Sequence, residues 1–211
     1  MSVVAIIGSG NVGRSLASRL IGAGHTVRFG ARDAAKARAA LGPGLDGVFV
    51  GDGADAARGA DVLILAVPAA AAVSAAQQAA PSPQTVVVDA TNPLRWDGGP
   101  VWNPPAEGSN TAAIAAALPG HAVVKGFNHF GAEIMADPST AHGAAHALFA
   151  GDDVAAKQRV MQLAQSIGFT ARDAGALRNA AVLENLCVLW IQLATAGGLG
   201  RDYAFCIAPR R

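Results

Sequence analysis

The sequence predicts an α/β protein with a doubly wound, mainly parallel sheet and a small C-terminal helical extension. Short apolar segments rich in β-branched residues alternate with segments of helical periodicity, which is the pattern of strands separated by helices. The strand segments are apolar throughout, as expected for a sheet covered on both faces. The 211 residues, 52% of them hydrophobic and 15% charged, have the composition of a globular chain.

Six strands and several helices can be located from these patterns. The expected strands cover residues 3–7, 26–30, 47–51, 61–67, 85–90 and 121–127. Helices are expected around residues 12–21 and 34–41, before the sixth strand with Ser109 or Asn110 as its cap, and from residues 152–153 to about 167. Residues 92–108 are rich in proline and glycine, so we expect a long ordered loop there, suited to shaping a pocket.

The C-terminal part is expected to be a long apolar helix over residues 179–196. Its apolar side chains share one broad face and are Val182, Leu183, Leu186, Leu189, Trp190 and Leu193. Such a face must be covered, either by the chain's own domain or also by a second subunit. We expect residues 1–172 to form the main domain, and residues 173–211 to form an extension packed on it that offers a dimer contact.

The composition also excludes several classes of partner. The formal net charge is +1 and the basic residues are scattered, so no nucleic acid is expected as a ligand. The apolar stretch 66–80 is short and interrupted by Pro68, so no membrane span is expected. The first strand begins directly after Met1 and Ser2, without a signal-peptide pattern, and we expect a cytoplasmic protein.

The cysteines and histidines give no sign of a metal site. Cys187 and Cys206 have no metal-like spacing and are expected to be packing residues in a reducing compartment. His121, His142 and His146 do not recur on one helix face. We therefore expect no bound metal.

A glycine-rich turn follows the first strand and opens the first helix. Its residues are Gly8, Ser9, Gly10, Asn11, Val12 and Gly13, a G-x-G-x-x-G pattern. Gly8 permits a tight turn, Gly10 lets the backbone approach a pyrophosphate, and Gly13 lets the helix pack closely on the strand. The free amides of the helix N-terminus then face the phosphates. This predicts a Rossmann-like dinucleotide-binding domain, the alternative being a degenerate one that binds nothing.

The end of the second strand indicates which dinucleotide is bound. NAD is usually held there by an acidic residue that accepts from the ribose hydroxyls, whereas this chain offers Ala31 and Arg32. The Arg32 guanidinium can clamp a 2′-phosphate, and Lys36 can add a second positive charge from the next helical turn. Asp33 is better placed to cap the next helix. The pattern favours NADP over NAD.

Further cofactor contacts are expected at the carboxyl ends of the fourth and fifth strands. The chain leaves the fourth strand through Pro68, and Ala69 and Val73 would then share a helix face near the nicotinamide half of the cofactor. The alternative is an ordinary strand-to-helix corner. Thr91 and Asn92 follow the fifth strand, at the edge where open α/β sheets bind ligands.

With these motifs in place, the sequence resembles the coenzyme F420-dependent NADP oxidoreductase family over almost its whole length. The matching segments are "IIGSGNVGRSLASRL", "GHTVRFGARD", "LAVP", "VVVDATNPL", "VVKGFNHFGAEIMADP", "FAGDD", "DAGALRNAAVLE" and "GRDYAF". The segments "KGFNHFGAEIM" and "DAGALRNA" are the most specific. The fold is also similar to the cytoplasmic reductase domain of the STEAP-type metalloreductases, which pass electrons from NADPH through a flavin to metal.

The resemblance implies hydride transfer between NADP(H) and the central ring of a deazaflavin (F420) or a flavin. It also implies that the adenosine phosphates are held by residues 9–12, Ala31, Arg32 and Lys36, and that the nicotinamide side is lined by Ala69, Val73 and Ala132. Asn128 and His129 are candidates for orienting an amide or stabilising charge on the acceptor ring. His129 could equally bond the backbone, and Lys125 is expected to end its strand in solvent.

Two other functions stay open from the sequence. One is the same enzyme class with a flavin, quinone or ferric complex as acceptor, and the other is a non-catalytic module that senses NADP(H). Trp96, Trp102, Phe127 and Phe130 favour an enzyme, because aromatic side chains suit a flat ring. The expected partners are NADP(H), a small-molecule electron acceptor and a second copy of the chain in a homodimer.

Overall fold

A computed structural model describes residues 1–208 and Arg210. Its central feature is a six-stranded sheet of order β3-β2-β1-β4-β5-β8, in which every neighbouring pair is parallel. The strands are β1 (Val3–Ile7), β2 (Thr26–Gly30), β3 (Phe49–Gly51), β4 (Val62–Leu65), β5 (Val86–Asp89) and β8 (Val123–Lys125). In spatial order these are the third, second, first, fourth, fifth and sixth strands of the sheet along the chain, the Rossmann order. The predicted fold class is confirmed.

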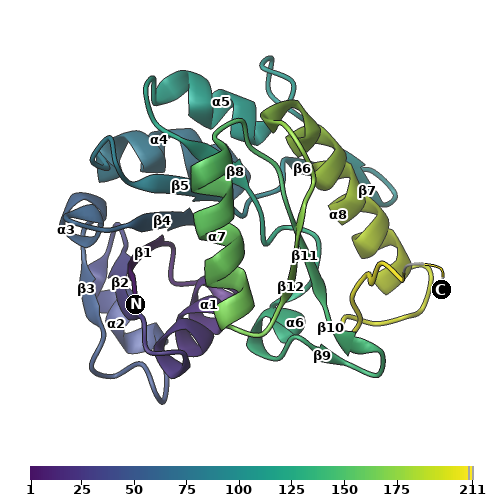
Figure 1. Cartoon of the computed structure of the whole chain (residues 1–211), viewed down its shortest axis with the longest axis horizontal. Helices are drawn as coiled ribbons and strands as arrows, with labels where there is room; N and C mark the ends of the chain where they lie inside the picture. Colours follow the sequence, from purple (N-terminus) through teal and green to yellow (C-terminus); the bar gives the residue numbers. More distant parts are fainter. Residues whose placement is uncertain (209, 211) are drawn as a thin grey trace.

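Helices cover both faces of the sheet, with α7 lying across it in the view of Figure 1. One face packs against α1 (Asn11–Gly22), α2 (Ala34–Ala40) and α7 (Val154–Ser166). The other packs against α3 (Gly53–Ala57), α4 (Ala69–Ala79) and α5 (Asn110–Ala117). The sheet is therefore the middle layer of three, and its parallel strands are buried on both sides.

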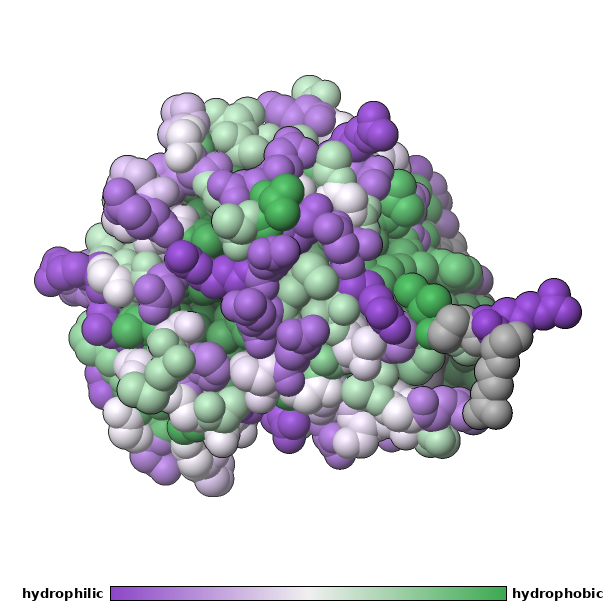
Figure 2. Space-filling model, viewed as in Figure 1, coloured by the Kyte–Doolittle hydropathy of each residue, from purple (hydrophilic) through white to green (hydrophobic). Residues whose placement is uncertain are grey.

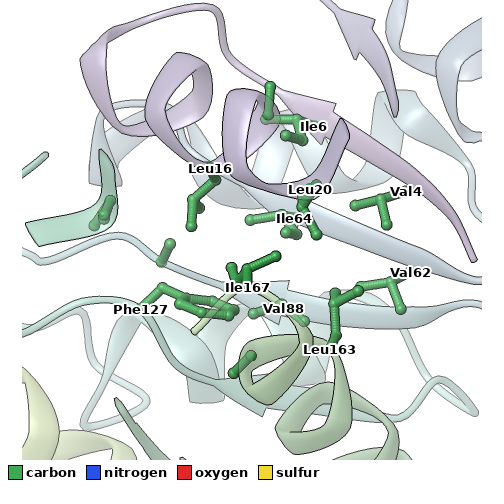
Figure 3. Packing of buried hydrophobic residues seen from close by; sticks show 14 of the residues in the cluster. Val4, Ile6, Leu16, Leu20, Val62, Ile64, Val88, Phe127, Leu163 and Ile167 are labelled. Atoms are coloured by element: carbon green, nitrogen blue, oxygen red, sulfur yellow. The ribbon is translucent and has the colours of Figure 1, made fainter. Parts of the chain in front are cut away.

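The larger part of the core lies between the sheet, α1 and α7. Leu16 and Leu20 of α1 and Leu163 of α7 meet the sheet residues Ile6 and Ile64, as Figure 3 shows. These side chains come from segments far apart in the sequence and are all nearly fully buried. Burial of this apolar surface is the main force that holds the helices to the sheet.

The predicted loop over residues 92–108 contains a hairpin, so the loop prediction was wrong in part. β6 (Leu94–Trp96) and β7 (Pro100–Trp102) pair antiparallel, with Leu94 opposite Trp102. Asp97, Gly98 and Gly99 make the turn, in which the Asp97 amide donates to the Gly99 carbonyl. Strands of three residues are too short to show a periodicity, although an Asp-Gly pair is a known hairpin signal.

The remaining elements follow β8 in the chain. They are α6 (Ala132–Ala136), β9 (Ser139–Thr140), β10 (Gly143–Ala144), β11 (His146–Phe149), β12 (Thr170–Asp173), the short 3-10 helix η1 (Leu177–Asn179) and α8 (Ala180–Ala194). β11 and β12 form a separate parallel pair, and Lys125 and Ala150 join β8 to the end of β11 through a single bridge. The division into a main domain and an extension at residue 173 stays a prediction.

The C-terminal helix presents two apolar faces where one was expected. Leu183 and Trp190 are buried against the rest of the chain, whereas Val182 and Leu189 are exposed. In Figure 2 apolar residues gather on the side of the molecule where Figure 1 places α8. Leu183 and Trp190 are seven residues apart, as are Val182 and Leu189, so each pair follows one line along the helix. Within the described part of the chain, no helix is long and apolar enough to span a membrane.

Two expectations about individual residues were wrong. Phe127 and Phe130 do not line a pocket but belong to the core, where they pack on Phe149 and Phe169. Cys187 is a buried packing residue as predicted, whereas Cys206 is exposed.

Candidate dinucleotide-binding site

The turn between β1 and α1 can be made only with glycine at two of its positions. Gly8 has φ +116°, and a Cβ there would lie 2.4 Å from the carbonyl oxygen of Ala66. A Cβ on Gly13 would lie 2.1 Å from the carbonyl oxygen of Gly8. Gly8 therefore serves the tight turn and Gly13 the close contact between helix and strand, as the motif predicts.

Gly10 has a different role, because a Cβ there would meet no protein atom within 4 Å. Gly10 is the N-cap of α1, and no side chain caps this helix. In contrast, α2, α5 and α7 are capped by Asp33, Ser109 and Asp153. The first amides of α1 thus lack a side-chain acceptor, and no protein atom fills the space where a Gly10 side chain would lie. This is the arrangement that a bound pyrophosphate needs, since it supplies the acceptors and comes close to the backbone.

Two cationic side chains stand beyond the end of β2. Arg32 and Lys36 are exposed, and neither side chain has a hydrogen bond or an ion pair to another described residue. Asp33 accepts from the Lys36 amide at 2.9 Å and so caps α2, as expected. Its carboxylate is therefore already engaged by the backbone, and a phosphate at this place would meet two available cations.

The other predicted cofactor residues follow the carboxyl ends of neighbouring strands. Ile7, Leu65, Asp89 and Lys125 form one row across β1, β4, β5 and β8. Several half-buried residues follow the strand ends, either in the turns or in the first turns of the helices. They are Ser9, Val12, Ala31, Ala69, Val73, Asn92 and Ala132. Asn11 is exposed beside them. The topology thus brings the predicted residues to one edge of the sheet, with α6 packed against α1.

Asn92 and Asn128 are joined directly across this edge. The Asn92 Nδ2 donates to the Asn128 carbonyl at 2.9 Å, and the Asn128 Nδ2 donates to the Asn92 Oδ1 at 2.8 Å. The Asn128 Nδ2 also donates to the carbonyl of Leu183 in α8, at 2.9 Å. The Asn128 Oδ1 is buried and has no partner among the described residues. The pair therefore ties the loops after β5 and β8 to the C-terminal helix.

His129 is fully buried and bonds the backbone. Its Nε2 accepts from the Leu148 amide at 3.1 Å. Burial and, to a smaller extent, the nearby Lys125 ammonium lower the pKa of His129 to about 4. The imidazole is therefore neutral at pH 7, and its accepting nitrogen is already occupied, so His129 is poorly suited to act as a general acid.

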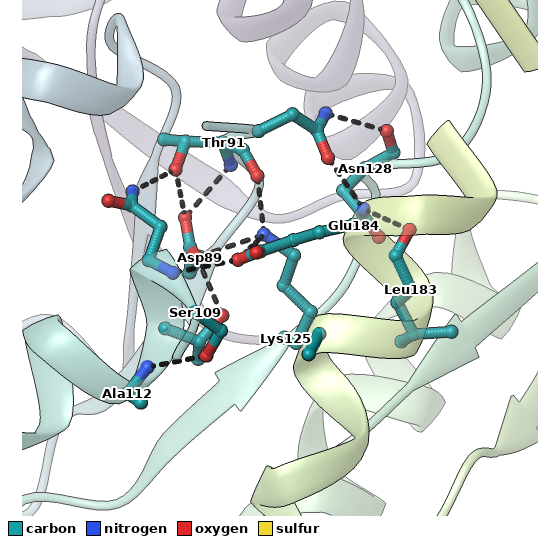
Figure 4. A network of polar contacts seen from close by, with 12 residues as sticks. Asp89, Thr91, Ser109, Ala112, Lys125, Asn128, Leu183 and Glu184 are labelled. Carbon is teal, nitrogen blue, oxygen red and sulfur yellow. Dashed lines mark hydrogen bonds and ion pairs between the residues drawn. The ribbon is translucent and has the colours of Figure 1, made fainter. Parts of the chain in front are cut away.

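A buried charged cluster at the carboxyl ends of β5 and β8 was not predicted from the sequence. Lys125, expected in solvent, is fully buried, since α5 packs on its strand and Glu184 of α8 contacts its ammonium. Its Nζ lies 3.0 Å from Asp89 Oδ2 and 3.5 Å from Glu184 Oε1, and it also donates to the Thr91 carbonyl (Figure 4). We call Asp89, Lys125 and Glu184 the buried charged cluster.

Polar neighbours complete the hydrogen bonds of the two carboxylates. Asp89 Oδ1 accepts from the Thr91 amide and hydroxyl, and Asp89 Oδ2 accepts from the Thr111 hydroxyl at 2.7 Å. Glu184 Oε1 accepts from the Asn110 amide at 2.9 Å, and Oε2 accepts from the Trp102 indole at 2.8 Å. Burial raises the pKa of Glu184, and Lys125 opposes the rise.

One sequence signal could have revealed this cluster. Glu184 is the single charged residue of α8, in a helix that is otherwise almost entirely apolar. A lone carboxylate on the buried side of a helix requires a partner. Lys125 ends a buried strand, which makes it the natural candidate. Among the described residues, no three His, Cys, Asp or Glu side chains are grouped so that they could hold a metal ion.

Comparison with known proteins gives three kinds of likeness. The family model described as NADP oxidoreductase, coenzyme F420-dependent, matches residues 3–93. The F420-dependent NADP reductase of Methanothermobacter thermautotrophicus is 34% identical over 212 residues, covering 92% of this chain and 89% of that protein. The metalloreductase STEAP3 of Rattus norvegicus is 33% identical over 182 residues, which cover 86% of this chain. This chain thus spans only 35% of the length of STEAP3.

Two solved structures are also similar to this chain. A crystal structure from Arthrobacter sp. FB24, named as an F420-dependent NADP reductase, has a TM-score of 0.87 and 31% identity, and covers 99% of this chain and 100% of its own. A reductive aminase from Aspergillus terreus in complex with NADPH has a TM-score of 0.66 at 20% identity, and covers 94% of this chain and 63% of its own. The second likeness shows the fold alone.

Proposed function

The chain belongs to the family of coenzyme F420-dependent NADP oxidoreductases, and on that premise we propose that it transfers a hydride between NADP(H) and the deazaflavin F420. The identity to an F420-dependent NADP reductase extends over 89% of that protein, which supports this acceptor. The assignment of NADP(H) as the cofactor rests on the open backbone at Gly10, at the uncapped start of α1.

We assign each part of the cofactor to residues at the carboxyl edge. The first amides of α1 bind the pyrophosphate, with Gly10 leaving room for it. Arg32 and Lys36 bind the 2′-phosphate, which distinguishes NADP from NAD. Ala69, Val73 and Ala132 line the nicotinamide side. When bound, NADPH supplies the hydride, so the protein needs to align two rings more than to supply a titrating group.

The acceptor is assigned to the side of the hairpin β6–β7. Trp96 is exposed at the end of β6 and offers an aromatic surface for a flat ring. Trp102 is held by its bond to Glu184 and keeps the hairpin in place. Asn128 and His129 fix the loop after β8 through their hydrogen bonds. We assign them this positioning role and no transfer of a proton.

A flavin or ferric reductase is the second candidate. Its support is the 33% identity to STEAP3 over 86% of this chain. We also propose that the chain forms a homodimer through the exposed apolar face of α8, which contains Val182 and Leu189.

Anaerobic mixing with NADPH separates these candidates. The protein is mixed in parallel with F420, FMN, FAD and a ferric chelate while the absorbance of NADPH is followed. We expect rapid oxidation with F420 and no reaction by the Gly10→Ala variant, which serves as the negative control. Oxidation by flavin or iron without F420 would support the second candidate. Tight NADPH binding without turnover on any acceptor would instead indicate a sensing module.

A further inference from the structure

The buried charged cluster carries more negative than positive groups. It contains one ammonium, on Lys125, and two carboxylates, on Asp89 and Glu184, and all three side chains are fully buried. Replacing buried charges by apolar side chains of similar size is often neutral or stabilising, so stability alone does not explain such a cluster. The net charge of the cluster therefore points to a role other than stability.

The surplus negative charge lies on the carboxylates of Asp89 and Glu184, which both accept hydrogen bonds. Both oxygens of Glu184 accept from donors, the Asn110 amide and the Trp102 indole. Burial and the neighbouring Asp89 raise the pKa of Glu184, whereas Lys125, the Trp102 indole and the Asn110 amide lower it. The Asn110 backbone amide, the Trp102 indole and the Lys125 ammonium all face these two oxygens, and each donor favours the carboxylate form. Counted as two carboxylates and one ammonium, the cluster has a formal net charge of −1.

Two neighbouring titratable groups do not cancel this charge. The pKa of His129 is lowered to about 4 by burial and by Lys125, so its imidazole is neutral. The pKa of Cys187 is raised to about 12 by burial, while Lys125 lowers it and Glu184 raises it, so its thiol is also neutral. Neither side chain therefore carries a charge that would cancel the negative charge of the cluster.

The cluster lies at the edge of the sheet to which the cofactor is assigned. Asp89 is in register with Leu65 and, one strand further, with Ile7, the residue before the glycine turn. Adjacent strands are about 4.8 Å apart, so Asp89 is on the order of 10 Å from the start of that turn. Asp89 also accepts from Thr91, the residue before Asn92. A nicotinamide beside Asn92 would lie within the field of the cluster.

We propose that the surplus negative charge of Asp89, Lys125 and Glu184 favours the oxidised nicotinamide over the reduced one and so makes bound NADPH a stronger hydride donor. Loss of a hydride removes one proton and two electrons from the neutral reduced ring and passes them to the acceptor, which leaves the ring with one positive charge. A nearby negative charge stabilises that product by Coulomb attraction. The inference rests on the proposed function, because it requires NADP(H) at this edge.

The test compares the affinity for the two oxidation states of the same cofactor. NADP⁺ and NADPH share the adenosine phosphates, so the ratio of their Kd values cancels those contacts and reports on the ring. Glu184→Gln and Asp89→Asn each remove one negative charge, from different elements. Each should raise Kd(NADP⁺)/Kd(NADPH). For a carboxylate about 10 Å from the ring, Coulomb's law gives a rise of about three- to tenfold at a dielectric constant of roughly 25–50.

Thr111→Val is the matched control. It removes the hydroxyl that donates to Asp89 Oδ2 but changes no charge and keeps the shape of the side chain. All proteins are titrated with both nucleotides at pH 8 by calorimetry, and their folding is checked by circular dichroism. We expect the Kd ratio of Thr111→Val to equal that of the wild type.

The Kd ratios of the variants decide between an electrostatic and a geometric effect on the cofactor. An unchanged ratio in a folded charge variant overturns the inference, and so does a Thr111→Val shift as large as that of Glu184→Gln, because the effect would then be geometric. If Glu184→Gln does not fold, Asp89→Asn gives the same test from β5 instead of α8. Wild-type protein that binds neither nucleotide would refute the proposed function itself and not the charge argument alone.

Discussion

Asn92 and Asn128 hold each other by two hydrogen bonds, of 2.9 and 2.8 Å, although they are 36 residues apart. Asn128 in addition bonds the Leu183 carbonyl of α8. This relationship connects the loop after β5, the loop after β8 and the C-terminal helix at the proposed cofactor edge.

The Asn128→Ala variant should be destabilised. It leaves the Leu183 carbonyl and the Asn92 Oδ1 without their donor, and an unpaired buried polar group costs about 1–3 kcal/mol. We expect the free energy of unfolding, measured with urea, to fall by this amount. Asn92→Ala is the control and should cost less, because Asn92 is only half-buried. Equal stability of Asn128→Ala and wild type would show that the pair does not hold the edge together.

Arg32→Ala should separate the binding of NADPH from that of NADH. If the guanidinium binds the 2′-phosphate, loss of a charged hydrogen bond costs about 1–3 kcal/mol, or roughly 5- to 150-fold in Kd for NADPH. NADH lacks this phosphate and serves as the internal control, with an unchanged Kd. An equal loss for both nucleotides, measured by fluorescence titration, would contradict the assignment.

Gly10→Ala and Gly13→Ala should fail in different ways. The Cβ of the first variant meets no protein atom within 4 Å, so we expect an unchanged Tm and loss of NADPH binding. The Cβ of the second would lie 2.1 Å from the Gly8 carbonyl oxygen, so the fold itself should lose about 3 kcal/mol or more. Unaltered NADPH affinity in Gly10→Ala would remove the pyrophosphate from this turn.

The low pKa of His129 predicts a loss of stability in acid. The folded protein holds this imidazole neutral down to a pKa of about 4, whereas the unfolded chain protonates it near 6.5. The unfolded state therefore binds more protons between these values, and stability rises with pH in this window and is complete above about 6.5. Over this window the contribution is roughly 3 kcal/mol.

His129→Gln keeps an acceptor for the Leu148 amide but cannot titrate. The difference in unfolding free energy between wild type and variant should therefore change between pH 6.5 and 4, as measured by urea unfolding at several pH values. Parallel curves over this range would show that His129 is not held neutral. Because the neutral imidazole of His129 is a very weak acid and its Nε2 is occupied by the Leu148 amide, kcat/KM of the folded variant should stay close to that of the wild type.

The homodimer proposal can be tested on the outer face of α8. A carboxylate in the centre of an apolar interface is strongly unfavourable, so Leu189→Glu should convert dimer to monomer in analytical ultracentrifugation. Val154→Glu is the matched control, since Val154 is an exposed apolar residue at the start of α7. A monomeric wild type, or a dimer that survives Leu189→Glu, would place the contact elsewhere or remove it.

The sequence by itself determined the parts of this protein that depend on local pattern. The alternation of apolar strands and helices predicted six strands, and all six lie in one parallel sheet of the structure. The spacing of Gly8, Gly10 and Gly13 predicted three different roles. The close contacts around Gly8 and Gly13 fit their steric roles, and the pyrophosphate contact of Gly10 stays a prediction. Such features can be read from neighbouring residues because backbone sterics and periodicity act over a few positions.

Only the tertiary structure decided which polar residues are buried together. Lys125 lies 36 residues from Asp89 and 59 from Glu184 in the chain, and no local pattern relates the three. Their contact depends on strand order, on the register of β5 and β8, and on how α8 covers the edge. The same holds for the two faces of α8, where an apolar stripe cannot say which side meets the core. Burial and pairing are properties of the packed chain, and so the charge beside the proposed nicotinamide site became visible only once the chain was folded.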